Sequence, residues 1–182
     1  MEKKEVLIVV DMQNDFIDGV LGTAEAQAII KPMENYIRNF CGDIIFTLDT
    51  HGDDYLNTSE GKKLPIPHCI YGTEGHSLKD ELFLASVHDG KKIQIYNKDR
   101  FADISILLDS IIKNADEIYL CGVCTDICVV SNALCLKALY PDKKICVIES
   151  LCAGTTKENH DATIKTMRSC QIDISDVDMM EK

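Results

Sequence analysis

The chain has 182 residues, of which 46% are hydrophobic and 27% are charged, and its formal net charge is −11. This length and composition are typical of one globular domain, here spanning residues 1–182, and exclude a disordered chain. The acidic balance argues against nucleic acid or an anionic membrane as a partner, because both require clustered lysine and arginine.

No segment approaches the roughly 20 consecutive apolar residues of a membrane-spanning helix, and the first ten residues lack the pattern of a signal peptide. We therefore expect a cytoplasmic protein, in which thiols stay reduced. Most of the nine cysteines are then expected to be small buried apolar residues. This interpretation is given to Cys41, Cys69, Cys135, Cys146, Cys152 and Cys170.

Short apolar runs alternate with stretches of helical periodicity, which is the pattern of an α/β fold. Strands are predicted at residues 6–10, 43–48, 92–96, 117–121, 144–149 and 171–174. Helices are predicted at residues 24–40, 104–113, 126–139 and 157–169. The expected fold is a single-domain, open, mainly parallel sheet of about six strands with helices on both faces.

Three chemically active side chains follow predicted strands. Asp11 follows residues 6–10, Lys98 follows residues 92–96, and Cys128 lies just beyond residues 117–121. In an open parallel sheet, ligands bind beyond the carboxyl ends of the strands. Each residue alone has an ordinary structural interpretation, but together they offer a base for a thiol and a cation that keeps the base ionised. The combination indicates an enzyme.

The turn before Cys128 has features of a strand-to-helix connection. Gly122 permits a tight turn, and Thr125 is a candidate N-cap. Cys128 would then lie in the first helical turn, where the helix dipole favours a thiolate and free N–H groups suit an oxyanion. Cysteines in first turns are also often structural, and Cys121 and Cys124 form a C-x-x-C pair that would suit a redox centre or half of a zinc site.

A polar stretch rich in Gly and Pro, residues 50–77, interrupts the alternation of strands and helices, and connections of this length are usually functional or disordered. Asp49 and His51 point to one face of an extended chain, and Glu60 and His68 follow. Two imidazoles and two carboxylates suit one divalent ion, Zn²⁺, Fe²⁺ or Mn²⁺. Asp49 and His51 could equally be ordinary polar residues at a strand end. Glu60 competes with three nearby residues, Asp53, Asp54 and Asn57.

Two segments resemble motifs of the isochorismatase-like cysteine hydrolases, which include nicotinamidases, N-carbamoylsarcosine amidases and isochorismatases. Residues 9–16 (VVDMQNDF) are similar to the opening motif, and residues 122–129 (GVCTDICV) are similar to the nucleophile motif. The resemblance spans essentially the whole chain and implies a homo-oligomer. It implies an Asp11–Lys98–Cys128 triad, a cis peptide bond before Cys124, and an oxyanion hole formed by the backbone N–H groups of Cys124 and Cys128.

Within this superfamily, Asp49, His51 and His68 resemble the metal site of nicotinamidases. Many nicotinamidases have a third histidine at a position corresponding to about Asn57, whereas some use a glutamate, which Glu60 fits. Isochorismatases and carbamoylsarcosine enzymes lack the metal set, so the resemblance favours the nicotinamidase branch.

The resemblance also implies how a substrate ring would be held. Nicotinamidases commonly place the pyridine ring between a Phe, here Phe16, and a second aromatic residue. Pro65 stands at that second position, which counts against nicotinamide.

The sequence predicts a metal-containing amidase that cleaves a small carboxamide to acid and ammonia through a thioester on Cys128, with nicotinamide as the leading substrate. Alternatives are a relative acting on another small amide, ureide or vinyl ether, a noncatalytic binding protein of the same fold, and a redox protein built on the cysteine cluster. The intact acid, amine and thiol argue against a noncatalytic protein.

Overall fold

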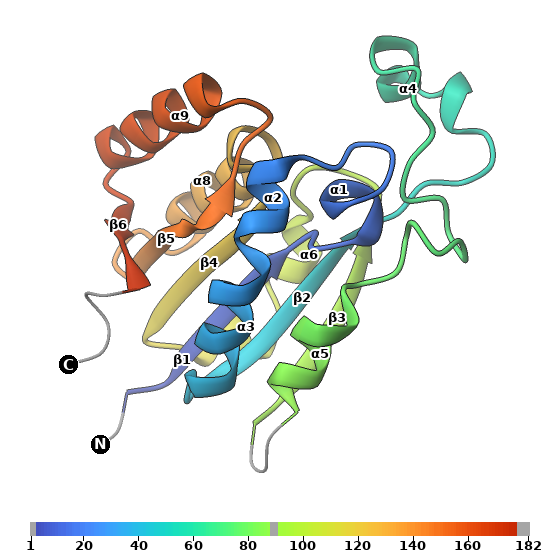
Figure 1. The fold of residues 1–182 in the computed structure, drawn as a ribbon. Coiled ribbons are helices and arrows are strands. Elements are labelled where there is room, and N and C mark those ends of the chain that lie inside the picture. The colour runs from blue at the N-terminus through green and yellow to red at the C-terminus, as the bar shows by residue number, and fades with distance from the viewer. Residues whose placement is uncertain (1–2, 88–90, 178–182) are drawn as a thin grey trace.

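Six parallel strands form one sheet in the computed structural model, which describes residues 3–87 and 91–177. The order across the sheet is β3-β2-β1-β4-β5-β6 (Figure 1). The strands are β1 Glu5–Val10, β2 Asp43–Asp49, β3 Ile93–Lys98, β4 Glu117–Val123, β5 Lys144–Ala153 and β6 Asp173–Ser175. Each predicted strand is present, with β5 extending four residues further than residues 144–149.

Helices cover both faces of the sheet, as predicted. On one face lie α2 Ala24–Ala28, α3 Ile30–Asn39 and α5 Asp80–Ser86 (Figure 1). On the other lie α6 Ile104–Leu107 and α8 Val130–Leu139, and α9 Lys157–Ser169 packs against α8. Because both faces are covered, the central strands are continuously apolar. Residues 6–10 of β1 are fully buried, and all of β4 is buried.

Two of the predicted helices are broken. The stretch 24–40 divides at Ile29 into α2 and α3, because Pro32 has no N–H for the carbonyl of Ala28 and is tolerated only in the first turn of a new helix. The stretch 104–113 divides into α6 and α7 Ser110–Asn114, because the Asp109 side chain caps α7 by accepting the Ile111 N–H.

A third predicted helix begins differently, and the fourth is correct. Residues 126–139 are a π-helical turn, Thr125–Val129, followed by α8, whereas α9 matches residues 157–169. Short elements were not predicted: α1 Asn14–Ile17, α5, and, within residues 50–77, the 3₁₀ turn Tyr55–Asn57 and α4 Ser59–Lys63. Within the described ranges, no helix is long and apolar enough to cross a membrane.

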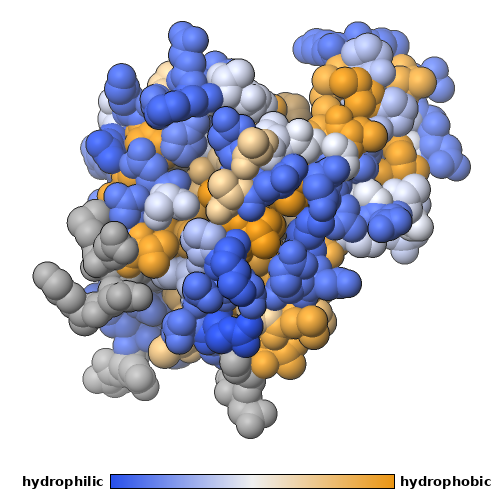
Figure 2. Space-filling view, viewed as in Figure 1, coloured by the Kyte–Doolittle hydropathy of each residue, from blue (hydrophilic) through white to orange (hydrophobic). Residues whose placement is uncertain are grey.

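The face seen in Figure 2 is mainly hydrophilic, with apolar areas among the polar ones. One apolar area lies over α5, where Phe83 and Leu84 are exposed, and another lies over the α4 segment, residues 50–77, where Leu56 and Ile66 are exposed. This segment extends away from the sheet at the end where strands β1 and β2 finish (Figure 1).

The chain leaves β1 and β4 toward opposite faces of the sheet, although these strands are neighbours. At such a switch point, the carboxyl ends of adjacent strands border a crevice that open α/β sheets use for ligands. Asp11 follows β1 directly, and the turn that contains Cys128 follows β4. The topology therefore brings the two segments singled out in the sequence to one place.

Candidate active site

The predicted acid, amine and thiol meet at the carboxyl edge of the sheet. The Lys98 Nζ atom lies 2.7 Å from Asp11 Oδ2 and 3.6 Å from Cys128 Sγ. All three residues are buried. Because Lys98 ends β3 at the edge of the sheet, its side chain reaches past β2 to contact residues that follow β1 and β4.

Asp11 is held in position by its own backbone and by β2. It has a left-handed backbone conformation with φ of 52°, and its N–H donates to the Thr47 carbonyl oxygen at 3.0 Å. The Thr47 hydroxyl donates to Asp11 Oδ1 at 2.7 Å. Asp11 Oδ2 faces the Lys98 ammonium as an ion pair, but it is buried and accepts no hydrogen bond of acceptable direction.

The turn before Cys128 depends on close contact between β4 and β1. Gly122 has φ of 121°, and a Cβ atom there would overlap the Val10 carbonyl oxygen. The peptide bond before Cys124 is cis, as the resemblance implied.

The predicted N-cap is wrong. Cys124 occupies the N-cap position of the π-helical turn, and the Thr125 hydroxyl instead pairs with His160 Nδ1 at 2.9 Å. The Thr125 side chain therefore connects the turn that contains Cys128 to α9.

Burial is the main influence on the pKa values of Cys128 and Asp11. It raises the pKa of Cys128 well above its ordinary value, with the Asp11 charge adding to the effect. Burial also raises the pKa of Asp11, and the nearby Lys98 only partly opposes this. The expectation of a dipole-stabilised resting thiolate is therefore wrong. Cys128 rests as a thiol beside a carboxylate whose affinity for a proton is increased.

Four potential metal ligands converge next to this triad. One ligand atom from each of Asp49, His51, Glu60 and His68 lies within 4.8 Å of all the others. His51 Nε2 is 2.8 Å from Asp49 Oδ2 and 3.9 Å from Glu60 Oε1, and His68 Nε2 is 3.5 Å and 3.8 Å from the same two oxygens. The structure thus brings the four predicted residues together, although they are spread over 20 positions of the chain.

The chemistry of this cluster fits a divalent ion. His51 Nε2 is buried and makes no hydrogen bond of acceptable direction. His68 Nδ1 donates to the Ile66 carbonyl oxygen at 2.8 Å, which leaves Nε2 with a free lone pair toward the cluster. Ligands at about 2.1 Å from a tetrahedral ion are separated by roughly 3.4 Å, close to the separations found here. Among the residues described, no other group of three or more His, Cys, Asp or Glu is arranged in this way.

Cysteine does not contribute to this cluster. All nine cysteines are free thiols, and Cys121 is fully buried with a pKa raised by burial. The expectation that Cys41 and Cys170 are buried is wrong, because both are exposed, whereas Cys69, Cys146 and Cys152 are buried.

Lys98 links the triad to the metal cluster, since its Nζ lies 3.8 Å from Asp49 Oδ1. Burial would raise the pKa of Asp49, but the adjacent imidazoles of His51 and His68 and the charge of Lys98 outweigh it and hold that pKa well below its usual range. Asp49 is therefore ionised, as a metal ligand must be.

Gln13 is a site residue that the sequence interpretation missed. Its buried amide donates to the carbonyl oxygens of Asp49 (2.8 Å) and His76 (2.9 Å), and its Oε1 accepts the Asp49 N–H at 2.7 Å. The signal for it was a polar residue two positions after Asp11, in a segment that is otherwise buried. Gln13 fixes the backbone of Asp49, a candidate metal ligand, relative to Asp11.

A pocket of about 780 Å³ opens beside the metal cluster. It extends from candidate ligands His51 and Glu60 to Ile127, the residue before Cys128. Phe16 is not among the described residues of its lining; its ring is half-buried and packs on His68 with 5.4 Å between ring centroids. The remaining lining residues are Thr50, Gly52, Asp54, Thr58, Ser59, Lys63, Leu64, Asp99, Arg100 and Phe101.

Comparisons with known proteins agree with this architecture. The family model described as isochorismatase domain matches residues 5–179. An uncharacterized isochorismatase family protein, PncA, from Bacillus subtilis is 34% identical over 170 residues, which cover 86% of this chain and 90% of that protein.

Two solved structures have the same fold over nearly their full length. The pyrazinamidase/nicotinamidase of Streptococcus mutans is 30% identical, with a TM-score of 0.77, covering 94% of this chain and 99% of the other. The pyrazinamidase of Pyrococcus horikoshii, crystallised in complex with zinc, is 25% identical, with a TM-score of 0.72, covering 95% and 99%. Both proteins are named for the hydrolysis of small aromatic amides.

Proposed function

The chain belongs to the isochorismatase family, and on that premise we propose that it cleaves nicotinamide to nicotinate and ammonia through a thioester on Cys128. That it is an amide-hydrolysing enzyme follows from its nicotinamidase relatives. The main support for cleavage of nicotinamide through Cys128 is the buried contact of Lys98 with both Asp11 and Cys128. This contact lies directly beside the cluster of four potential metal ligands.

In the proposed first step, Asp11 accepts the Cys128 proton while the sulfur attacks the amide carbon. General-base transfer at the moment of attack suits a thiol that rests protonated and a carboxylate with a raised pKa. Lys98 orients Asp11 and offsets the negative charge that burial makes costly.

The tetrahedral intermediate then collapses. The backbone N–H groups of Cys124 and Cys128 are the proposed donors to its oxyanion. As the carbon–nitrogen bond breaks, Asp11 returns its proton to the amine, which leaves as ammonia. Water next attacks the thioester while Asp11 accepts a water proton. As the carbon–sulfur bond breaks and the acid is released, Asp11 passes this proton to the Cys128 sulfur, which restores the thiol and the carboxylate.

Asp49, His51, Glu60 and His68 are the residues that would hold a divalent ion, and zinc is the ion named in the Pyrococcus horikoshii complex. Bound there, the ion would supply a Lewis acid for a ring nitrogen of the substrate and a site for water. Phe16, against His68, is the proposed contact for the substrate ring.

The test is ammonia release from nicotinamide by the purified, metal-replete protein. Turnover should fall more than about 10³-fold in Cys128→Ala. It should persist in Cys170→Ala, which removes an exposed thiol, and in Cys124→Ala, since the proposed donor at that position is the backbone.

The outcomes separate the competing functions. Turnover that survives in Cys128→Ala would overturn the mechanism. Loss of turnover in Cys124→Ala with Cys128 intact would favour a role for the C-x-x-C pair. Absence of turnover with nicotinamide, together with hydrolysis of another small amide, would keep the mechanism and change the substrate.

A further inference from the structure

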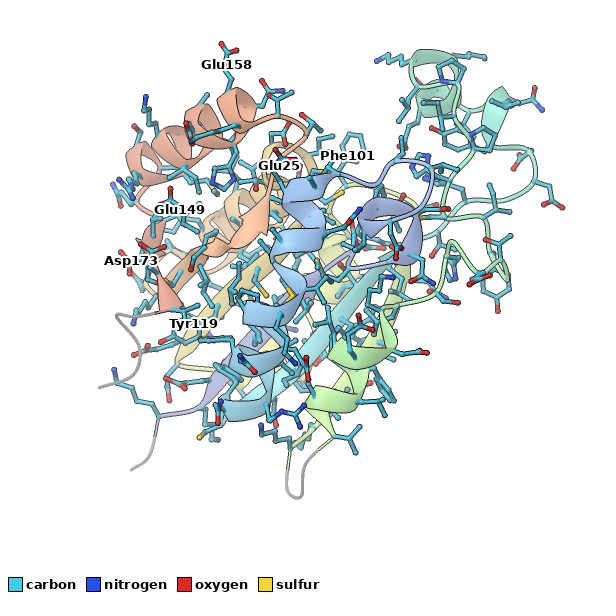
Figure 3. The ribbon with its side chains drawn as sticks, in the orientation of Figure 1. Glu25, Phe101, Tyr119, Glu149, Glu158 and Asp173 are labelled. Atoms are coloured by element: carbon cyan, nitrogen blue, oxygen red, sulfur yellow. The ribbon has the colours of Figure 1, made fainter. Side chains whose placement is uncertain are left out.

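The two edges of the sheet differ in how well they are protected against pairing with another strand. Among the described residues, β3 and β6 each have a neighbouring strand on one side only, and β3 has six residues whereas β6 has three. β6 also begins with the charged Asp173 (Figure 3). Short edge strands and charged side chains are the usual protection of a sheet edge. Residues 93–97 of β3 have neither, since they include no charged side chain and leave Ile95 45% exposed.

The hydrogen bonds between β3 and β2 show which backbone groups of β3 point outward. The N–H of Ile44 donates to the Lys92 carbonyl oxygen at 2.9 Å. The N–H of Thr50 donates to the Lys98 carbonyl oxygen at 2.8 Å. Because successive residues of a strand direct these groups to opposite sides, the even-numbered residues bond to β2 and the odd-numbered residues 93, 95 and 97 point away from it. Their N–H and C=O groups form a row that another strand could pair with.

Apolar side chains flank this row on the face of the sheet that α5 covers. The Tyr96 hydroxyl donates to Asp109, which joins α6 to α7, so the next side chain in the alternation, Ile95, points to the opposite face. That face carries the apolar area over α5 seen in Figure 2. Its exposed side chains on α5 and directly after it are Phe83, Leu84 and Val87, with exposed fractions of 38%, 67% and 55%. A partner on the β3 edge would therefore cover apolar surface as well as backbone.

Charges at the two ends make the β3 edge complementary to a second copy of itself. Lys91 lies before β3 and Asp99 directly after it. In an antiparallel pair, outward-pointing residues of the two strands must lie opposite one another. A pair centred on Ile95 meets this condition and places Lys91 of each copy opposite Asp99 of the other. A centre one residue away would place Lys91 opposite Asn97 or Phe101, which carry no charge, so the charges favour the register centred on Ile95.

We propose that two copies of this chain associate through the outer edge of β3, paired antiparallel about a two-fold axis at Ile95. The two sheets would then form one continuous sheet. Because this axis runs perpendicular to the sheet, both α5 helices would lie on the same face, where their exposed apolar side chains can pack together. This inference concerns assembly and does not depend on the proposed function.

The first test is the mass of the protein in solution, measured by analytical ultracentrifugation. The wild type should have twice the mass of Ile95→Lys, because two lysines facing each other at the axis should raise the Kd of the pair at least about 100-fold. Ile95→Val should keep the wild-type mass. Val20→Lys, which places the same charge at an exposed apolar position between α1 and α2, is the matched control and should also keep it.

The second test examines the register by exchanging the charges. Lys91→Glu and Asp99→Lys should each raise the Kd about tenfold, because each replaces two attractive pairs by two repulsive ones. The double variant Lys91→Glu/Asp99→Lys restores opposite charges in both pairs and should return the Kd to within about twofold of the wild type.

A wild-type protein that sediments as a monomer at every concentration would overturn the inference, and a strand of a different protein would then be the occupant to seek. A wild-type assembly unchanged by Ile95→Lys would place the contact elsewhere and also overturn it. Dissociation by Val20→Lys as well would assign the effect to added charge. Failure of the double variant to recover would overturn the register centred on Ile95. If Ile95→Lys does not fold, Leu84→Lys on α5 replaces it in the comparison, with the same expected loss of mass.

Discussion

Lys98 brings one buried ammonium group into contact with Asp11, Cys128 and Asp49. Its ammonium is fully buried against Asp11, whose side chain is also without exposed surface. Burial alone would lower the pKa of Lys98, but the charges of Asp11 and Asp49 outweigh it and raise that pKa. The cation therefore stays charged next to the acid.

We predict that Lys98→Met leaves Asp11 as an unpaired buried charge. The free energy of unfolding should fall by about 3–5 kcal/mol, and nicotinamide turnover should fall at least about 100-fold. Urea unfolding and ammonia release measure the two effects.

The double variant Asp11→Leu/Lys98→Met separates these effects. Removal of both charges should recover much of the lost stability and none of the activity. A single variant as stable as the wild type would contradict the buried ion pair.

At the residue scale, the sequence allowed prediction of those site residues that lie at or just after the end of a strand. Asp11, Lys98 and Cys128 were predictable because parallel strands end at one edge. Gln13 was missed because its side chain acts on the backbone of distant segments, which no local spacing encodes. The protonation of Cys128 was mispredicted because helix position is a local property and burial is not.

At the scale of elements, the spacing of apolar residues predicted the strands and most of the helices. It did not predict the positions at which two of the helices are broken. Apolar spacing continues through Ile29 and Leu108, so the pattern does not register the breaks caused by Pro32 and Asp109. The four- to seven-residue helices α1, α4 and α5 are too short for a 3.6-residue period to be distinguished.

The amino end of β4 carries a charge cluster whose effect depends on pH. The buried Glu117 carboxylate accepts hydrogen bonds from Lys3, from Tyr119 Oη at 2.5 Å and from Lys144 Nζ at 2.8 Å. Burial would raise the pKa of Glu117, but these partners outweigh it and lower the pKa to about 2. A pKa below the unfolded value means that ionised Glu117 stabilises the fold.

This contribution should be complete above pH about 4.5, the ordinary glutamate value, and be lost as the pH falls toward 2. We predict that Glu117→Gln is less stable than the wild type by about 1–2 kcal/mol at pH 7, and that the difference shrinks between pH 4.5 and pH 2. Urea unfolding at pH 7, 4 and 3 measures it.

The control for this series is Glu149→Gln, which removes a more exposed pair with Arg168 at 3.2 Å. It should change the unfolding free energy by less than about 0.5 kcal/mol at each pH. If the unfolding free energy of Glu117→Gln differs from that of the wild type by the same amount at every pH, the cluster does not stabilise the fold through ionisation of Glu117.

At the scale of the molecule, the alternation of strands and helices in the sequence predicted the fold class. The crevice at the carboxyl ends of β1 and β4 depends in addition on the order of the strands in the sheet. The order β3-β2-β1-β4-β5-β6 could not be deduced from the sequence, because many parallel orders satisfy the same alternation. The homo-oligomer and the cytoplasmic location stay predictions. Light scattering in solution is the measurement for the first.

A metal ion bound by residues 50–77 would make the stability of the whole molecule depend on metal. His51 lies at the start of this segment, Glu60 in α4 and His68 after α4, so a bound ion would connect three separate parts of one segment. We predict that zinc added to the metal-free protein at 100 times its Kd stabilises the fold by about 2.7 kcal/mol, which raises the thermal midpoint by roughly 5–10 °C. Zinc should also slow proteolysis within residues 50–77, because cleavage requires local opening.

Glu60→Gln and Asp54→Asn test whether the carboxylate of α4 is a ligand. Both replace an acid by its amide in the same segment and beside the same pocket, but only Glu60 belongs to the cluster. Zinc titration calorimetry should show affinity reduced at least about tenfold in Glu60→Gln, since an amide is the weaker ligand, and unchanged in Asp54→Asn. Equal losses in both would mean that the segment attracts zinc only by its total charge. A loss in Asp54→Asn alone would make Asp54, the residue before the 3₁₀ turn, the fourth ligand and leave Glu60 as a residue of the pocket wall.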